Sequence, residues 1–315
     1  MSATAGKPNP WTGRPRFGLP QPTASAVRLF CFTPAGGGPT MYTQHAWAEL
    51  PPSIELMPVL LPGRAQRLAE SPLDSVEAMA AGALRGLRPM LDERPYALFG
   101  HSLGASVALE FARLVAADGA VAQPVHLIVS ARLPQGSLKP VSGGGGRLLS
   151  DIADDREFIA AIHGKYGTLQ MVLDNPDLME MVLPMMRADF RAAETYALSP
   201  LESPLAVRAP SSPFSMLSCR WLSDGTHSGS TCIARALSGL RFATTADWLR
   251  CRQSQVPITA LGGELDGYSA EQLEAWSALT VDFRGVTMLD GAKHMYASEP
   301  PQAMCELLVR TLSHP

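Results

Sequence analysis

Residues 96–105 read Tyr-Ala-Leu-Phe-Gly-His-Ser-Leu-Gly-Ala, and this stretch decides the fold. Tyr96 to Phe99 is a short run of strand-forming residues, and an apolar helix is predicted from about 103 to 117. Between them lies Gly100-His101-Ser102-Leu103-Gly104, a G-x-S-x-G pattern. At a sharp strand-to-helix turn, this pattern lifts the serine hydroxyl above the edge of a sheet. The pattern alone also fits an ordinary turn, but its position between strand and helix predicts a nucleophilic serine at Ser102.

Strands and helices alternate on both sides of this stretch. The predicted strands are short and continuously apolar, which is typical of a parallel sheet covered by helices on both faces. The strands lie at 27–32, 54–61, 96–99, 125–129, 258–261 and 286–289, and the helices at 75–91, 103–117, 270–279 and 304–312. The sequence therefore predicts an α/β protein with a mostly parallel central sheet.

Residues 27–312 are expected to form one domain, which follows a flexible leader at 1–26. Two segments interrupt the alternation of strands and helices. Residues 148–196 carry only helical patterns, with Asn175-Pro176 as cap and first helical residue, and are expected to form a lid. Residues 203–254 contain 10 serines and 6 arginines but no lysine or glutamate. This composition predicts a disordered insert, unless the segment is misassigned coding sequence.

Charge and composition exclude several classes of protein. The chain has 26 basic and 29 acidic residues, whereas a dedicated nucleic-acid binder usually has a strongly basic face. No apolar run reaches the roughly 18 residues that span a bilayer. Five widely spaced cysteines without a C-x-x-C pair predict free thiols, no cysteine-based zinc site and a reducing compartment. The first 26 residues lack the apolar stretch of a secretory signal, so a cytoplasmic location is expected, with an organelle-targeting peptide as the alternative.

A nucleophilic serine needs a general base and an acid that orients this base. In the α/β-hydrolase fold these residues follow in the order serine, acid, histidine, on loops after the carboxyl ends of strands. Asp266 follows the fifth predicted strand and His294 follows the sixth. They are the predicted acid and base, with Glu264 and Asp290 as alternative acids. This chemistry needs neither a cofactor nor a metal ion.

The oxyanion that forms during acyl transfer needs two fixed hydrogen-bond donors. One is predicted to be the backbone N–H of Leu103, the first residue of the helix after Ser102. The other is expected from the loop Pro34-Ala35-Gly36-Gly37-Gly38, with the backbone N–H of Ala35 as the candidate. A flexible turn is the alternative for this loop. A phosphate cradle is disfavoured because no Lys-Ser or Lys-Thr pair follows the glycines.

These motifs together resemble those of the stand-alone type II thioesterases of polyketide and non-ribosomal peptide pathways, a group that includes oleoyl-carrier-protein hydrolases. The first strand with its glycine-rich loop, the turn at Ser102, and the positions of Asp266 and His294 all fit this family. Further similar segments are Leu61-Pro62-Gly63-Arg64 with Arg67-Leu68, Ser130-Ala131-Arg132, Asn175-Pro176-Asp177-Leu178, Arg187-Ala188-Asp189-Phe190 and Glu194-Thr195-Tyr196. The resemblance covers residues 27–196 and 256–312.

The resemblance implies a monomeric serine thioesterase that removes acyl groups from the phosphopantetheine arm of acyl or peptidyl carrier proteins, in an editing role. The lid residues Met181, Met185 and Phe190 are candidate contacts of the acyl chain, for which methionine is an adaptable side chain, with plain core packing as the alternative. Carrier proteins are acidic, so Arg64 and Arg67 are candidate partner contacts, with solvated or structural arginines as the alternative. A carboxylesterase or lipase of the same fold, or an inactive hydrolase-like binding protein, also fits, because fold and triad do not fix the substrate.

The sequence departs from the family pattern at three places. Thr33 is an extra residue before Pro34, and it is expected to shift the loop that carries Ala35. Met295-Tyr296 stands where the family more often has an aromatic pair, which is expected to alter the pocket. The insert at 203–254 has no counterpart in the family.

Overall fold

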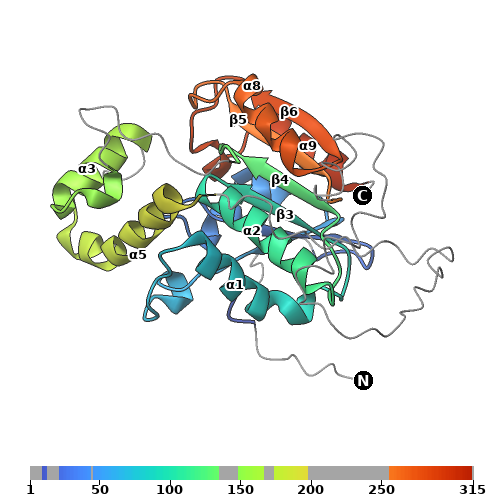
Figure 1. Cartoon of the computed structure of the whole chain (residues 1–315), viewed down its shortest axis with the longest axis horizontal. Helices are drawn as coiled ribbons and strands as arrows, with labels where there is room; N and C mark the ends of the chain where they lie inside the picture. The colour runs from blue at the N-terminus through green and yellow to red at the C-terminus, as the bar shows by residue number, and fades with distance from the viewer. Residues whose placement is uncertain are drawn as a thin grey trace, which may run out of the picture.

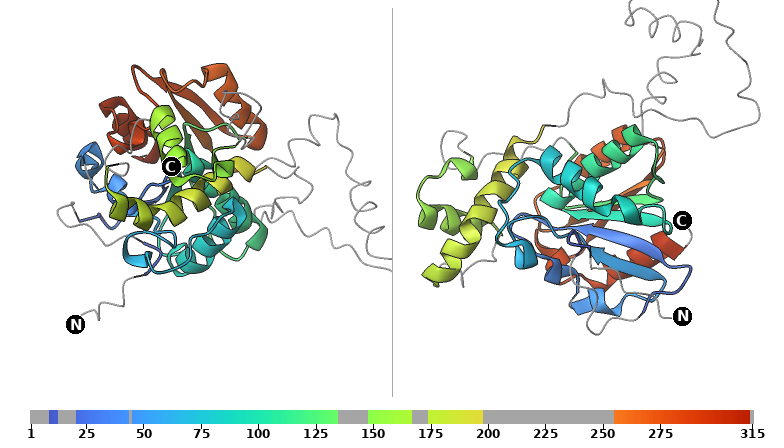
Figure 2. Two further views of the ribbon diagram at one scale, coloured as in Figure 1. Left: turned by 90° about the vertical axis from the view of Figure 1, so that its left-hand side faces the viewer. Right: turned by 90° about the horizontal axis from the view of Figure 1, so that it is seen from below.

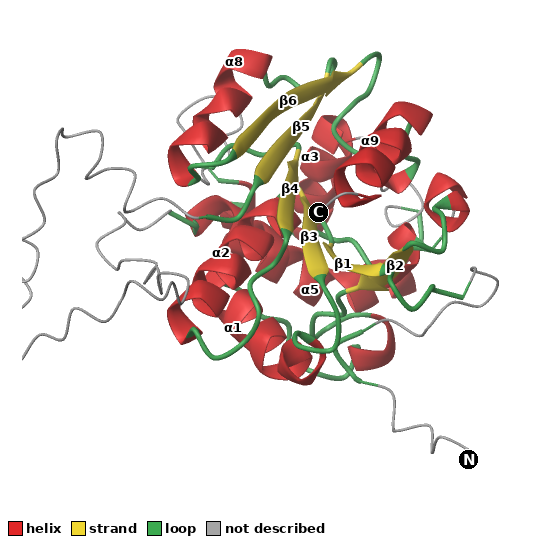
Figure 3. Ribbon diagram, turned by 90° about the vertical axis from the view of Figure 1, so that its right-hand side faces the viewer, coloured by secondary structure: helices red, strands yellow, loops and turns green. Residues whose placement is uncertain are grey.

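The computed structural model describes residues 9–12, 21–43, 45–134, 148–166, 174–197 and 255–313. The six strands within this part of the chain form one parallel sheet in the order β2-β1-β3-β4-β5-β6 (Figure 3). They are β1 (Val27–Phe32), β2 (Ile54–Pro58), β3 (Tyr96–His101), β4 (His126–Ser130), β5 (Ile258–Gly263) and β6 (Phe283–Leu289). The prediction of an α/β fold with a parallel sheet is confirmed.

Helices cover both faces of the sheet (Figure 1). Helices α1 (Val76–Leu87) and α2 (Leu103–Asp118) pack on one face, and α9 (Gln302–Ser313) packs on the other. Side chains of β1 alternate between the two cores: Phe30 and Phe32 join the core under α1 and α2, whereas Leu29 joins the core under α9. Because both faces are covered, every residue of β1 is buried, which explains the continuous apolar run in the sequence.

Two further helices, α3 (Asp155–Tyr166) and α5 (Pro176–Thr195), stand beside the sheet layers and are called the lid below (Figures 1 and 2). They share a small apolar core that includes Phe158, Met186 and Phe190. Helix α5 begins as predicted, because the Asn175 side chain accepts the N–H of Leu178 and a proline follows Asn175. The predicted insert at 203–254, with its predicted disorder, lies outside the described residues.

Residues 9–12, which belong to the predicted flexible leader, are anchored on the domain. The Trp11 ring packs on α1, where a Cβ added to Gly82 or Gly86 would lie 2.5 or 2.0 Å from its atoms. The Trp11 carbonyl accepts the N–H of Leu60 at 2.8 Å, and Thr12 forms an antiparallel bridge with Val59. The large Trp11 ring fits over these two helical glycines, which explains why residues 9–12 are held in place. The predicted flexibility therefore does not extend over the whole of 1–26.

Element boundaries differ from the predicted ones in places. The helix predicted at 270–279 is a single turn, α8 (Ala270–Leu273), followed by a 3₁₀ segment at Glu274–Leu279. Strand β2 ends at Pro58 instead of 61. Across the described ranges, no helix combines the length and the apolar character that crossing a bilayer requires.

Candidate active site

Ser102 occupies the tight turn between β3 and α2. Its backbone has φ 54° and ψ −118°, a conformation that residues other than glycine rarely adopt. The turn depends on two glycines: a Cβ on Gly100 would lie 2.2 Å from the Gly104 carbonyl oxygen, and a Cβ on Gly104 would lie 2.1 Å from that of Phe32. The Ser102 N–H donates to the Ser130 carbonyl at 2.8 Å, which ties the turn to the end of β4. This is the strained geometry that the G-x-S-x-G pattern predicts.

His294 lies between Ser102 and Asp266. Its Nε2 is 3.0 Å from Ser102 Oγ, and its Nδ1 is 2.5 Å from Asp266 Oδ1. The Asp266 side chain is only 1% exposed. Because an ionised carboxylate only accepts hydrogen bonds, Nδ1 carries the hydrogen and the Nε2 lone pair faces the serine hydroxyl. The structure therefore brings the three predicted residues together in the order of a Ser-His-Asp triad.

The two alternative acids have other surroundings. Glu264 Oε2 accepts the N–H of Gly291 at 2.8 Å and so fixes the turn that leads to His294. Asp290 is exposed to solvent. Asp266 is thus the carboxylate that contacts the imidazole.

Behind the triad, His101 belongs to a buried polar chain that the sequence did not reveal. Its Nε2 lies 2.7 Å from the His294 carbonyl, which can only accept, so Nε2 carries the hydrogen. Its Nδ1 then accepts the Ser130 hydroxyl at 2.8 Å, and Ser130 Oγ accepts the Tyr296 hydroxyl at 2.6 Å. Burial, with a smaller effect of His294, lowers the pKa of His101 to about 3. His101 is therefore neutral and only weakly basic, and both of its ring nitrogens are engaged, so it is unsuited to be the general base.

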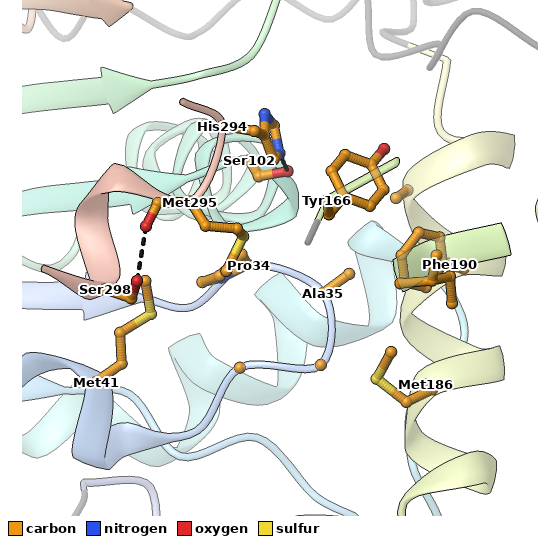
Figure 4. A pocket seen from close by; sticks show the side chains of 14 residues that line it. Pro34, Ala35, Met41, Ser102, Tyr166, Met186, Phe190, His294, Met295 and Ser298 are labelled. Carbon is orange, nitrogen blue, oxygen red and sulfur yellow. Dashed lines mark hydrogen bonds between the residues drawn. The ribbon is translucent and has the colours of Figure 1, made fainter. Parts of the chain in front are cut away.

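A cavity of about 260 Å³ borders Ser102 and His294 (Figure 4). The Tyr166 ring, from the end of α3, packs against the His294 ring with 4.9 Å between centroids. Burial raises the pKa of the Tyr166 hydroxyl well above its usual value, so this group is neutral. The apolar wall consists of Met41, Ile162, Met186, Phe190, Ala193 and Met295. Tyr166 and Met186 were not among the predicted site residues, because helical periodicity does not show which part of a helix meets the cavity.

Of the two predicted oxyanion donors, Ala35 lines this cavity, and Leu103 directly follows Ser102, which also lines it. Leu103 is the first residue of α2, so its N–H has no acceptor within the helix. Ala35 lines the cavity together with Ser102. The extra residue Thr33 is buried at 2% exposure and does not remove Ala35 from the cavity.

The lid residues predicted to contact substrate have different positions. Phe190 lines the cavity, as predicted. Met185 instead lies in the apolar core between α3 and α5. Met181 is 46% exposed and does not line this cavity, so its contact with the acyl chain stays a prediction. Met186 and Phe190, which are four residues apart on one face of α5, border the cavity in their place.

The prediction that Arg64 and Arg67 contact a partner protein is wrong. Arg64 is 4% exposed and forms an ion pair with Asp189, with 2.7 Å between Nη2 and Oδ1. Arg67 is 9% exposed, donates to Glu70 and to the Leu60 carbonyl, and lies over the Trp11 ring. Both arginines are structural because partners within the chain satisfy their charge and remove them from the surface.

The site can perform acyl transfer with its own side chains. It offers a serine hydroxyl, an imidazole and a buried carboxylate in the arrangement that a nucleophile, its base and an orienting acid require, next to an apolar cavity and a helix N-terminus. Within the described residues, no group of three or more histidine, cysteine or acidic side chains is arranged to hold a metal ion. The fold and this set of side chains define the class of protein, a hydrolase of the α/β-hydrolase fold.

The chain belongs to the thioesterase family, because the family model of the thioesterase domain matches residues 27–312. It is 39% identical to the thioesterase PikA5 of Streptomyces venezuelae over 231 residues, which are 71% of this chain and 78% of that protein. It is 29% identical to the gramicidin S biosynthesis protein GrsT of Aneurinibacillus migulanus over 293 residues, 92% of this chain and 90% of that one.

Similar solved structures include two type II thioesterases. YbtT, a type II thioesterase from the yersiniabactin pathway, is 25% identical with a TM-score of 0.68, covering 94% of this chain and 96% of its own. BorB, the type II thioesterase from the borrelidin cluster, is 27% identical with a TM-score of 0.64, covering 93% of this chain and 95% of its own. The predicted resemblance to type II thioesterases and the assignment as a hydrolase are confirmed.

Proposed function

We propose that this chain is an editing thioesterase that hydrolyses acyl groups from phosphopantetheine thioesters on acyl or peptidyl carrier proteins. The observation that carries the proposal is the Ser102–His294–Asp266 alignment at an apolar cavity, in a chain of the thioesterase family. The similarity to YbtT and BorB, type II thioesterases of biosynthetic pathways, supports the carrier-bound substrate. We expect a monomer that acts in the cytoplasm, as the sequence predicts.

In the proposed reaction Ser102 Oγ attacks the thioester carbonyl while His294 Nε2 accepts the hydroxyl proton. Asp266 holds the N–H of Nδ1 and stabilises the charged imidazole. The N–H groups of Leu103 and Ala35 bind the oxyanion. When the tetrahedral intermediate collapses, the C–S bond breaks and the imidazolium gives its proton to the phosphopantetheine sulfur. His294 then removes a proton from water, which attacks the acyl-serine carbonyl. The bond between the acyl carbon and Ser102 Oγ breaks, the imidazolium returns its proton to Oγ, and the carboxylic acid leaves.

The deciding experiment is hydrolysis of a short acyl-phosphopantetheine carrier protein by the full chain and by Ser102→Ala. The variant is expected to lose roughly 10⁴- to 10⁶-fold in kcat while its thermal unfolding stays close to that of the parent. An oxygen ester with the same acyl group serves as the matched substrate. Turnover of the oxygen ester without turnover of the thioester would refute the proposal and favour a carboxylesterase.

A further inference from the structure

The loop that carries Ala35 is fastened to the lid. The N–H of Gly36, the residue after Ala35, donates to Asp189 Oδ2 at 2.8 Å. Asp189 lies on α5, the longer lid helix, and has no exposed surface. One side chain of the lid thus fixes the peptide group next to the proposed oxyanion donor.

Arg64 completes this connection from a third segment of the chain. Its guanidinium donates through Nη2 to Asp189 Oδ1 at 2.7 Å, and through Nη1 to Asp189 Oδ2 at 3.1 Å. The same Nη1 donates to the Gly37 carbonyl at 3.0 Å. Two backbone groups of neighbouring loop residues, the N–H of Gly36 and the C=O of Gly37, are therefore held by the two members of one buried ion pair. A bidentate arginine–carboxylate pair fixes direction as well as distance.

The fit between the loop and α5 is also steric. Gly36 has φ +73°, and a Cβ at this position would lie 2.4 Å from the sulfur of Met186. Met186 lies one turn before Asp189 on α5 and lines the cavity. Figure 4 shows Met186 of α5 beside the loop that carries Ala35. The loop is thus packed against the lid and hydrogen-bonded to it over the same few residues.

We propose that Asp189 and Arg64 are positioning residues for the oxyanion hole. This inference rests on the proposed function. An oxyanion donor acts within a range of a few tenths of an ångström, so the peptide plane after Ala35 must be held firmly.

The test compares three variants of the full chain. Asp189→Asn puts an amide N–H₂ against Arg64 Nη2 and disturbs the pair. The double variant Arg64→Met with Asp189→Leu replaces the pair by apolar side chains, which avoids an unpaired buried charge. Arg187→Gln is the control, because Arg187 lies two residues from Asp189 but pairs with Asp155 at the lid surface.

The readouts are kcat and KM for a short acyl-carrier protein, and the inhibition constant of an alkylboronic acid, whose serine adduct mimics the oxyanion. We expect the first two variants to lose about 10²- to 10³-fold in kcat, the loss typical of one oxyanion donor. The boronic acid should bind more weakly by a similar factor, while KM, product inhibition by the carboxylic acid and the pH profile stay unchanged. The control Arg187→Gln should keep kcat, KM and the inhibition constant within about twofold of the parental values.

Thermal unfolding of each variant separates positioning from folding. If Asp189→Asn does not fold, the double variant tests whether the ion pair positions the loop that carries Ala35. A folded double variant with parental kcat and boronate affinity would overturn the inference while leaving the thioesterase function intact. A wild-type chain that neither hydrolyses the thioester nor binds the boronate would overturn the proposed function, and this inference with it.

Discussion

The buried imidazole of His101 makes a quantitative prediction about stability and pH. His101 is fully buried, and both ring nitrogens are engaged, with Ser130 and with the His294 carbonyl. Its pKa is lowered from 6.5 to about 3, first by burial and then by the nearby His294. We predict that His101→Gln, whose amide nitrogen still reaches the position of Nε2, removes a large part of the acid sensitivity of the fold.

Proton linkage gives the direction in which the stability of the fold changes with pH. Between pH 6.5 and about 3, the unfolded chain binds a proton at His101 that the folded chain does not bind. The stabilising contribution of neutral His101 is therefore complete above pH 6.5 and is lost as the pH falls toward 3. Each pH unit in this range is worth about 1.4 kcal/mol. At about pH 4.5 the wild type should have lost about 3 kcal/mol through this residue, whereas glutamine does not titrate.

Urea unfolding at about pH 7.5 and about pH 4.5 measures this difference. The drop in unfolding free energy between the two pH values should be smaller in His101→Gln by about 3 kcal/mol. His126, whose pKa is also lowered, to about 4, is present in both chains, so its contribution cancels. Equal drops in the two proteins would refute the reasoning, since they would mean that His101 binds a proton in the folded chain.

Three further predictions concern the leader, the cavity and the lid. Trp11→Ala should lower the unfolding free energy by about 1–3 kcal/mol in urea, less than for a fully buried tryptophan, and an effect below about 0.5 kcal/mol would contradict the anchoring. Met186→Ala should shift kcat/KM toward longer straight acyl chains by about tenfold, and an unchanged preference would remove Met186 from the acyl site. Tyr166→Phe should keep parental kcat and Tyr166→Ala should lose up to about tenfold, whereas equal losses would assign the effect to the hydroxyl instead of the ring.

The parts of the fold that the sequence predicted are those with a local physical cause. Strand β1 reads as an apolar run because both of its faces are buried, and the helix cap at Asn175 needs only the residues next to it. The turn at Ser102 was readable because Gly100 and Gly104 are the residues that its close backbone contacts demand. The order of Asp266 and His294 along the chain followed from the fold, once the strands before them were predicted.

The wrong and the missed predictions depended on contacts between distant segments. Arg64 looks like a surface cation in the sequence, but Asp189, 125 residues further along, takes it out of solvent. Helical periodicity identified α5 as amphipathic, yet it could not orient the helix, so the exposed Met181 was chosen over Met186. Tyr166 ends its helix, where periodicity carries little weight, and its contact with His294 exists only because the lid folds over the sheet.

Two buried polar networks hold the reacting groups from opposite sides, and neither contains a proposed reacting atom. His101, Ser130 and Tyr296 hold the backbone carbonyl of His294, while Arg64 and Asp189 hold the loop of Ala35. Burying an arginine and an aspartate costs several kcal/mol in desolvation, and well-packed apolar residues would stabilise the same place equally well or better. Stability therefore does not explain the ion pair. Its contacts with the Gly36 N–H and the Gly37 carbonyl fit the positioning role proposed above, because a directional ion pair can hold both backbone groups of the loop at once.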